Sequence, residues 1–116
     1  MFQKDMKISL LLDFYGDILS ERRREIIEMY YNEDLSLSEI AEITGISRQG
    51  VRDSVKKSEK ELSELEETLG LAGRFSKLKE ELSRIIAEID SLSSRSGGDM
   101  SEELKKVKSS LEELDI

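Results

Sequence analysis

The segment best suited to binding chemistry is "GISRQGVRDSVKK", which holds four basic residues and one acidic residue in a chain of formal net charge −8. If Val51 and Val55 face the interior of a helix, a rotation of about 100° per residue places Arg48, Arg52 and Lys56 together on its flank. Such a row suits the phosphates and guanine edges of a nucleic acid. The alternative is a solvated helix face whose charges pair with neighbouring glutamates.

Neighbouring side chains extend this candidate surface. Ser47 would offer a hydroxyl group and the N-terminus of the helix to a phosphate, and Gln49 could pair with adenine. The candidate nucleic-acid-binding residues of this segment are Ser47, Arg48, Gln49, Arg52, Lys56 and Lys57.

A second candidate lies in "SERRRE", where Arg22, Arg23 and Arg24 occupy the first turn of a predicted helix. The helix macrodipole favours acidic residues there and disfavours cations, so local helix stability does not explain these three arginines. Contact with phosphates would explain them. Pairing with the glutamates of the same helix is the alternative, and the sequence leaves both interpretations open.

The elements that would position the first segment match a helix-turn-helix. Ser36 and Glu39 form a capping box that predicts a short helix over residues 37–44, Gly45 ends it with a positive φ angle, and Ser47 caps the next helix. The residues at the expected apolar, small and turn positions are Ile40, Ala41, Gly45, Ile46, Val51 and Val55. The motif is therefore expected over residues 36–57, with a helical hairpin of an ordinary bundle as the alternative.

Two helices are predicted before the motif. Apolar residues at steps of three and four predict a first helix that ends near "ILS", and Ser20 is the predicted N-cap of the second. The apolar stripe of the first helix is Ile8, Leu11, Leu12, Tyr15, Ile18 and Leu19, and that of the second is Ile26, Ile27 and Tyr30.

Heptad patterns fill the second half of the chain. After Val55 the fourth helix keeps the heptad spacing, with Ser58 in one apolar place. The segment "LGLAG" predicts a tight turn that contains Gly70 and Gly73. The segment "SSRSGG", residues 93–98, predicts a Ser/Gly linker. The predicted packing or dimer residues are Leu62, Leu65, Leu69, Phe75, Leu78, Leu82, Ile85 and Ile89. The sixth helix repeats the heptad at Met100, Leu104, Val107, Leu111 and Leu114. Such seams must be buried within the chain or against a second copy, and we expect a homodimer.

Composition bounds the fold and the function. The sequence has no proline, 5% aromatic and 38% charged residues, which predicts an all-α fold with a helix-turn-helix domain over residues 1–57 and an extended helical tail over 58–116. The tail carries a net charge of −6, with nine basic and fifteen acidic residues. The absence of histidine and cysteine removes the usual proton-transfer, thiol and zinc chemistry, so we expect neither an enzyme nor a metal or other cofactor. Acidic residues interrupt the first apolar segment, so we expect a soluble cytoplasmic protein without membrane insertion.

Roughly residues 10–71 resemble a known family. The motifs "DFYG", "YY.ED.SL.EIAE" and "SRQ.V.D" fall in the order and spacing of the bacterial YlxM-type (UPF0122) proteins, which are related in this region to domain 4 of sigma factors. The resemblance implies a sigma region 4-like helix-turn-helix and a gene that usually stands beside that of the signal recognition particle GTPase. The sequence departs from the family at Gly50 and Arg52, where alanine and an aromatic residue are expected.

Three functions follow from these expectations. The first is a nucleic-acid-binding accessory or regulatory protein of the signal recognition particle pathway, as the resemblance implies, acting on its RNA, its GTPase or both. The second is a DNA-binding transcription regulator that acts as a homodimer. The third is a pure protein-interaction module, which the net negative charge favours because non-specific nucleic-acid binders are usually basic.

Overall fold

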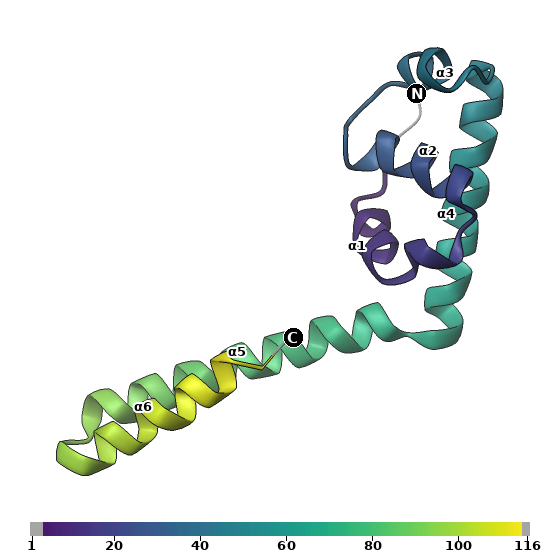
Figure 1. The fold of residues 1–116 in the computed structure, drawn as a ribbon. Helices are drawn as coiled ribbons and strands as arrows, with labels where there is room; N and C mark the ends of the chain where they lie inside the picture. The colour runs from purple at the N-terminus through teal and green to yellow at the C-terminus, as the bar shows by residue number, and fades with distance from the viewer. Residues whose placement is uncertain (1–3, 115–116) are drawn as a thin grey trace. The chain divides into compact units, whose positions relative to one another are not determined.

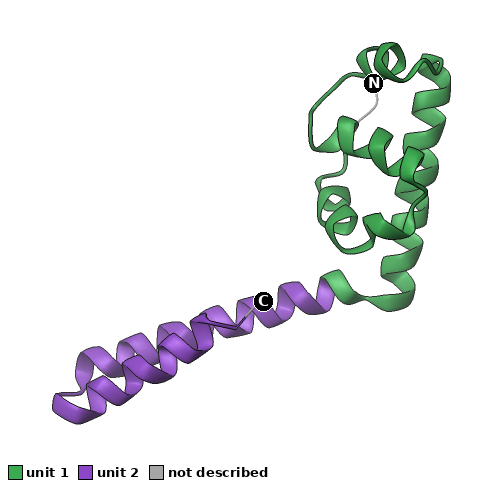
Figure 2. Cartoon of the chain, in the orientation of Figure 1, with its two compact units in different colours: residues 1–72 green, residues 73–116 purple. Residues whose placement is uncertain are grey.

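The computed structural model describes residues 4–114, and every regular element in that part of the chain is a helix (Figure 1). The elements are α1 (Met6–Tyr15), the 3₁₀ turn η1 (Gly16–Ile18), α2 (Glu21–Tyr31), α3 (Leu37–Thr44), α4 (Arg48–Leu69), α5 (Leu71–Arg95) and α6 (Gly98–Glu112). The prediction of an all-α fold is confirmed. The chain forms two compact units, residues 1–72 and 73–116 (Figure 2).

Serine side chains begin the helices of the N-terminal unit. Ser20 accepts a hydrogen bond from a first-turn amide of α2, and Ser47 accepts one from the Gly50 amide at 3.0 Å at the start of α4. Ser36 and Glu39 form the full capping box of α3, with each side chain bonded to the other residue's amide at 3.1 Å. All three caps were predicted, and each stabilises its helix by about 1 kcal/mol.

Glycines in the left-handed region end α3 and α4. Gly45 has φ 75° and donates its amide to the Ala41 carbonyl at 2.9 Å, which ends α3 where predicted. Gly70 has φ 63° and ends α4 in the same way. The turn after α4 is tighter than predicted because α5 begins at Leu71, directly after Gly70, so Gly73 lies inside α5.

Two clusters of buried apolar side chains hold the N-terminal unit together, and α4 contributes to both. One cluster joins α2, α3 and the first half of α4 and consists of Ile26, Tyr30, Leu37, Ile40, Val51 and Val55. The other consists of Ile8, Leu11, Leu12, Tyr15, Leu19, Ile27, Leu62 and Ala72. Because Leu62 and Ala72 belong to the second cluster, this unit extends beyond Lys57, the last residue of the helix-turn-helix motif.

The predicted apolar stripe of the first helix is wrong at one residue. Ile18 is 55% exposed, whereas Leu19 is buried. Tyr15 has φ −119° and ψ 0°, outside the helical region, so the short 3₁₀ turn that follows does not continue the rotation of α1 and Ile18 leaves its stripe.

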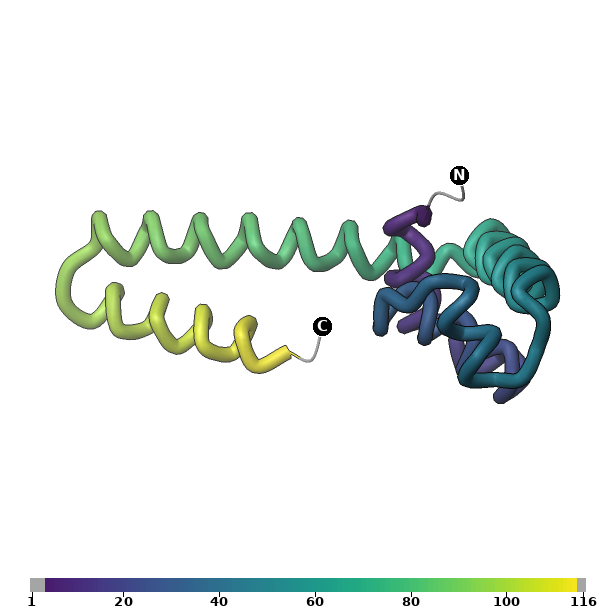
Figure 3. The backbone as a smooth tube through the Cα atoms, turned by 90° about the horizontal axis from the view of Figure 1, so that it is seen from above, coloured from purple at the N-terminus to yellow at the C-terminus, as the bar shows by residue number. Residues whose placement is uncertain are grey.

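The C-terminal unit contains a helical hairpin in which α5 and α6 run side by side in opposite directions (Figure 3). The hydroxyl groups of Ser93 and Ser101 lie 3.1 Å apart, and Lys108 forms an ion pair with Asp90 at 2.8 Å. In the serine- and glycine-rich segment 93–98, the first three residues end α5, two residues lie between the helices, and Gly98 begins α6.

Candidate nucleic-acid interface

The first half of α4 presents cations on one face and apolar side chains on the other. Val51 and Val55 are fully buried in the cluster shared with α2 and α3. Arg48, Arg52 and Lys56, the basic stripe, are exposed. The valines orient the helix because burying them fixes its rotation, and the four-residue spacing then keeps the cations together on the outer face.

Polar neighbours of the basic stripe are held in defined positions. The Gln49 side-chain amide donates a hydrogen bond to the Asp53 carboxylate at 2.9 Å, which leaves the Gln49 carbonyl oxygen available to a ligand. The Ser47 oxygen accepts from the Gly50 amide, so its own O–H can still be donated. Lys57 is exposed one residue beyond the stripe.

The local charge of this surface is opposite to that of the whole chain. Residues 45–57 contain four basic residues and one acidic residue, and α4 has no acidic residue in its first turn. The positive end of the helix macrodipole therefore adds to the guanidinium charge of Arg48. Together they favour the binding of an anion at the N-terminus of α4.

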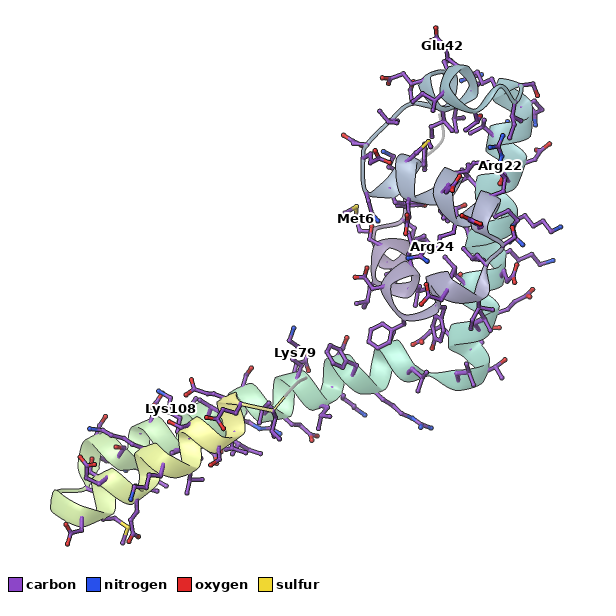
Figure 4. All side chains as sticks on the ribbon, viewed as in Figure 1. Met6, Arg22, Arg24, Glu42, Lys79 and Lys108 are labelled. Carbon is purple, nitrogen blue, oxygen red and sulfur yellow. The ribbon has the colours of Figure 1, made fainter. Side chains whose placement is uncertain are left out.

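Two of the three α2 arginines are engaged at the surface of the N-terminal unit. Arg22 donates to the Thr44 carbonyl oxygen at 2.9 Å, at the end of α3. Arg24 contacts Asp17 at 2.6 Å and Glu28 at 3.1 Å, and these two carboxylates, chiefly the hydrogen-bonded Glu28, raise the pKa of the guanidinium. Both side chains are labelled on α2 in Figure 4.

Arg23 contacts α4. Its Nε donates to the hydroxyl of the fully buried Ser58 at 3.2 Å, and its Nη2 lies 2.6 Å from a carboxylate oxygen of Glu61. The contact accounts for serine at the apolar heptad place of α4, because an apolar side chain there would leave the guanidinium without this acceptor. The three arginines thus have partners on η1, α2, α3 and α4.

Two tyrosine contacts that the sequence did not predict join the helices of the N-terminal unit. Tyr15 donates to Glu66 at 2.7 Å, and burial, reinforced by this bond, raises the pKa of its phenol. Tyr31 donates to Glu59, and burial again is the larger cause of its raised pKa. Each pair joins residues at least 28 positions apart, so no local pattern could have revealed it.

A groove adjoins the basic stripe at Arg48, which lines it together with the segment before α3 and its first turn. Lys4 and Asp34 also line it and form an ion pair at 2.5 Å, and the Lys4 ammonium lies 4.5 Å from the centre of the Tyr30 ring. The hydrogen bond that Lys4 donates, together with its charge, lowers the pKa of Asp34. Glu39 also lines the groove, so its charged side chains balance, and Arg48 is the cation there that is not paired with Asp34.

The predicted packing residues fall into two groups. Leu62 is fully buried and Leu65 packs against the same cluster, so both contribute to the core of the N-terminal unit. The others, on the last turn of α4 and along α5, are partly buried or exposed: Leu69, Phe75, Leu78, Leu82, Ile85 and Ile89.

Residues 4–114 contain neither a cluster of side chains typical of a metal site nor a membrane-spanning helix. No group of three or more acidic, histidine or cysteine side chains there is arranged to hold a metal ion. No helix in the same range is long and apolar enough to cross a membrane.

Comparison with known proteins gives one family. The sequence model of the family described as "Putative helix-turn-helix protein, YlxM / p13 like" matches residues 2–109. A UPF0122 protein of Desulforamulus reducens is 44% identical over 108 residues, which cover 93% of this chain and 90% of the relative. A UPF0122 protein of Acetivibrio thermocellus is 43% identical over 113 residues, 96% of each chain. A UPF0122 protein of Bacillus cereus is 38% identical over 115 residues, 99% of this chain and 100% of the relative.

Proposed function

The chain belongs to the YlxM / p13-like helix-turn-helix family, and from this premise we propose that it is a nucleic-acid-binding accessory or regulatory protein that binds through the basic stripe of α4. The observation that carries the proposal is the burial of Val51 and Val55, since it turns the guanidinium groups of Arg48 and Arg52 outward. An exposed row of cations at a helix N-terminus is suited to a phosphate backbone.

The proposed ligand is the RNA of the signal recognition particle, and the proposed protein partner is its GTPase. The motifs shared with YlxM-type proteins support this assignment, because that family is linked to the particle through its gene neighbourhood. The proposed setting is the cytoplasm, and the proposed form is a homodimer.

A DNA-binding regulator is the second candidate. A short helix, a left-handed glycine and a second helix with an exposed polar face form the geometry that enters a major groove, and α3, Gly45 and α4 have that form. Gln49 and Arg52 would then contact base edges, and a two-fold dimer would contact two half-sites about 34 Å apart.

The basic stripe can be tested by measuring the binding of duplex DNA and of the particle RNA as a function of salt. For duplex DNA, log K should fall against log salt with a slope of about −0.9 per neutralised phosphate, and Arg48→Ala or Arg52→Ala should each reduce the slope by about one. Lys7→Ala is the matched control, because it removes one positive charge from an exposed position on α1. It should leave the slope unchanged.

Three results separate the candidates. Equal effects of all three substitutions would contradict binding through the basic stripe, because they would report net charge alone. Particle RNA that random duplex displaces at near-physiological salt would favour the DNA regulator. Binding of the GTPase without any salt-dependent binding of nucleic acid would indicate a protein-interaction module.

A further inference from the structure

The α5–α6 hairpin leaves two rows of large apolar side chains uncovered. Every seventh residue of α5 from position 78, and every seventh residue from position 100 through position 114, belongs to them, and each is 44–57% exposed. The two uncovered rows comprise Leu78, Ile85 and Leu92 on α5 and, from the second helix, Met100 and Val107 on α6 with Leu114 just beyond its end. A seven-residue repeat keeps a helix in contact with a neighbour along its whole length, so these rows have the spacing of packing surfaces.

The two rows share one side of the hairpin. On α5, Ile85 is rotated by about 50° from the line of the half-buried Leu82 and Ile89, since it follows Leu82 by three residues and precedes Ile89 by four. On α6, Val107 stands in the same relation to Leu104 and Leu111. The helices run in opposite directions, so an equal rotation about each helix's own axis brings both rows to the same side.

The opposite side of the hairpin is closed by polar contacts. Ser93 follows Ile89 by four residues, which rotates it away from Ile85, and its hydroxyl lies 3.1 Å from that of Ser101. Asp90 lies on the same side of α5 and pairs with Lys108 at 2.8 Å, a residue that Figure 4 labels on α6. The hairpin is therefore a two-helix layer with one polar edge and one apolar face.

We propose that this apolar face packs against the same face of a second copy of the chain, so that two hairpins form a four-helix bundle. This inference rests on the homodimer in the proposed function and adds which surface forms it. A two-helix layer with a single apolar face is half of such a bundle. Packing it against its own copy places each heptad row opposite another heptad row, because a two-fold interface pairs the same patch on both subunits.

The size of the face is close to the lower limit of a specific interface. α6 has 15 residues, which gives the paired layer a length of about 22 Å, and two helices side by side are about 20 Å wide. The projected area is thus roughly 440 Å² per copy, and the accessible area of a ridged surface exceeds its projection. Two copies together project roughly 880 Å², so the buried accessible area lies near the roughly 1,000 Å² at which a specific interface begins.

Sedimentation equilibrium of three full-length variants tests the proposal. Ile85→Lys and Val107→Lys each place a charge at the centre of the face, on different helices. Ala87→Lys is the matched control, because Ala87 is exposed two residues from Ile85, about 160° around α5. Both face variants should raise the dimer dissociation constant by at least 100-fold, since an unpaired charge buried in an interface is strongly unfavourable, and the control should change it less than threefold.

Circular dichroism and the salt titration make the outcomes unambiguous. Retained helicity would show that a face variant remains folded, and the milder Ile85→Ser, also expected to weaken the dimer, replaces any variant that loses helicity. A wild-type chain that stays monomeric at tens of micromolar would overturn the proposal, as would face variants that dimerise like the control. Nucleic-acid binding is measured separately, so its loss in Arg48→Ala with an intact dimer concerns the proposed function alone.

Discussion

Replacing Arg23 should destabilise the N-terminal unit without weakening nucleic-acid binding. Arg23→Met keeps much of the aliphatic stem, so the main loss is the guanidinium. Ser58 is fully buried, and its hydroxyl would lose the 3.2 Å contact with Nε, which costs roughly 1–3 kcal/mol. The ion pair with Glu61 adds at most about 1 kcal/mol, because that carboxylate is 36% exposed and can be hydrated.

The expected loss in the free energy of unfolding is therefore about 2 kcal/mol, which corresponds to a fall of roughly 10 °C in the melting temperature of a unit of this size. Urea unfolding followed by circular dichroism measures it. Arg48→Met is the matched substitution, since Arg48 is an exposed cation of the basic stripe. It should leave stability within about 0.5 kcal/mol of the wild type and weaken the binding of nucleic acid.

A double substitution identifies the cause. In Arg23→Met combined with Ser58→Ala, the buried hydroxyl is also gone, so part of the lost stability should return. The explanation fails if Arg23→Met unfolds at the wild-type urea concentration but binds nucleic acid more weakly. That result would mean that Arg23 leaves its intramolecular partners to contact phosphate.

Two further predictions concern the first turn of α4 and the tyrosines. Gly50→Ala should destabilise the protein by about 1 kcal/mol in spite of alanine's helix propensity, because a Cβ would lie 2.6 Å from the Ile46 Cγ2. In a protein that already carries Ile46→Ala, the same change should stabilise the fold by about 0.5–1 kcal/mol. Equal effects of Gly50→Ala in both proteins would exclude the clash. All three tyrosines have a pKa above the ordinary 10.0, chiefly through burial, so the folded state holds phenolic protons that the unfolded state releases. Stability should be unaffected by these groups below pH 10 and should fall as the pH rises above it, and tyrosinate absorbance that develops below pH 10 in the folded protein would contradict the assignment.

The helix boundaries of the N-terminal unit could be predicted because the groups that set them are close in sequence. Ser36 and Glu39 cap α3 from three residues apart, and Gly45 ends it at the next position after Thr44. The start of α5 could not be placed in the same way. Glu66, on the preceding helix, accepts a hydrogen bond from the Ala72 amide at 3.1 Å, and this partner across the turn allows α5 to begin directly after Gly70.

The candidate site could be predicted only in part, for the same reason. The orientation of the basic stripe follows from Val51 and Val55, because a helix needs only local spacing to define its faces. The partners of Arg23 on α4 lie at least 35 residues away, and their approach depends on how α2 packs against α4. The sequence therefore left the role of the α2 arginines open between phosphate contact and pairing within one helix, and it did not suggest pairing between helices.

The structure of α4 explains how an acidic chain can present a basic surface. The carboxylates of Glu59 and Glu66 accept hydrogen bonds from tyrosines of α2 and α1, and Glu61 forms an ion pair with an arginine of α2. These negative charges are therefore directed toward the protein. The cations of the first half of α4 have buried valines behind them and solvent in front. At physiological ionic strength, exposed charges farther away than about 8 Å are largely screened. A phosphate at the N-terminus of α4 would therefore respond mainly to the local positive charge and far less to the net charge of −8.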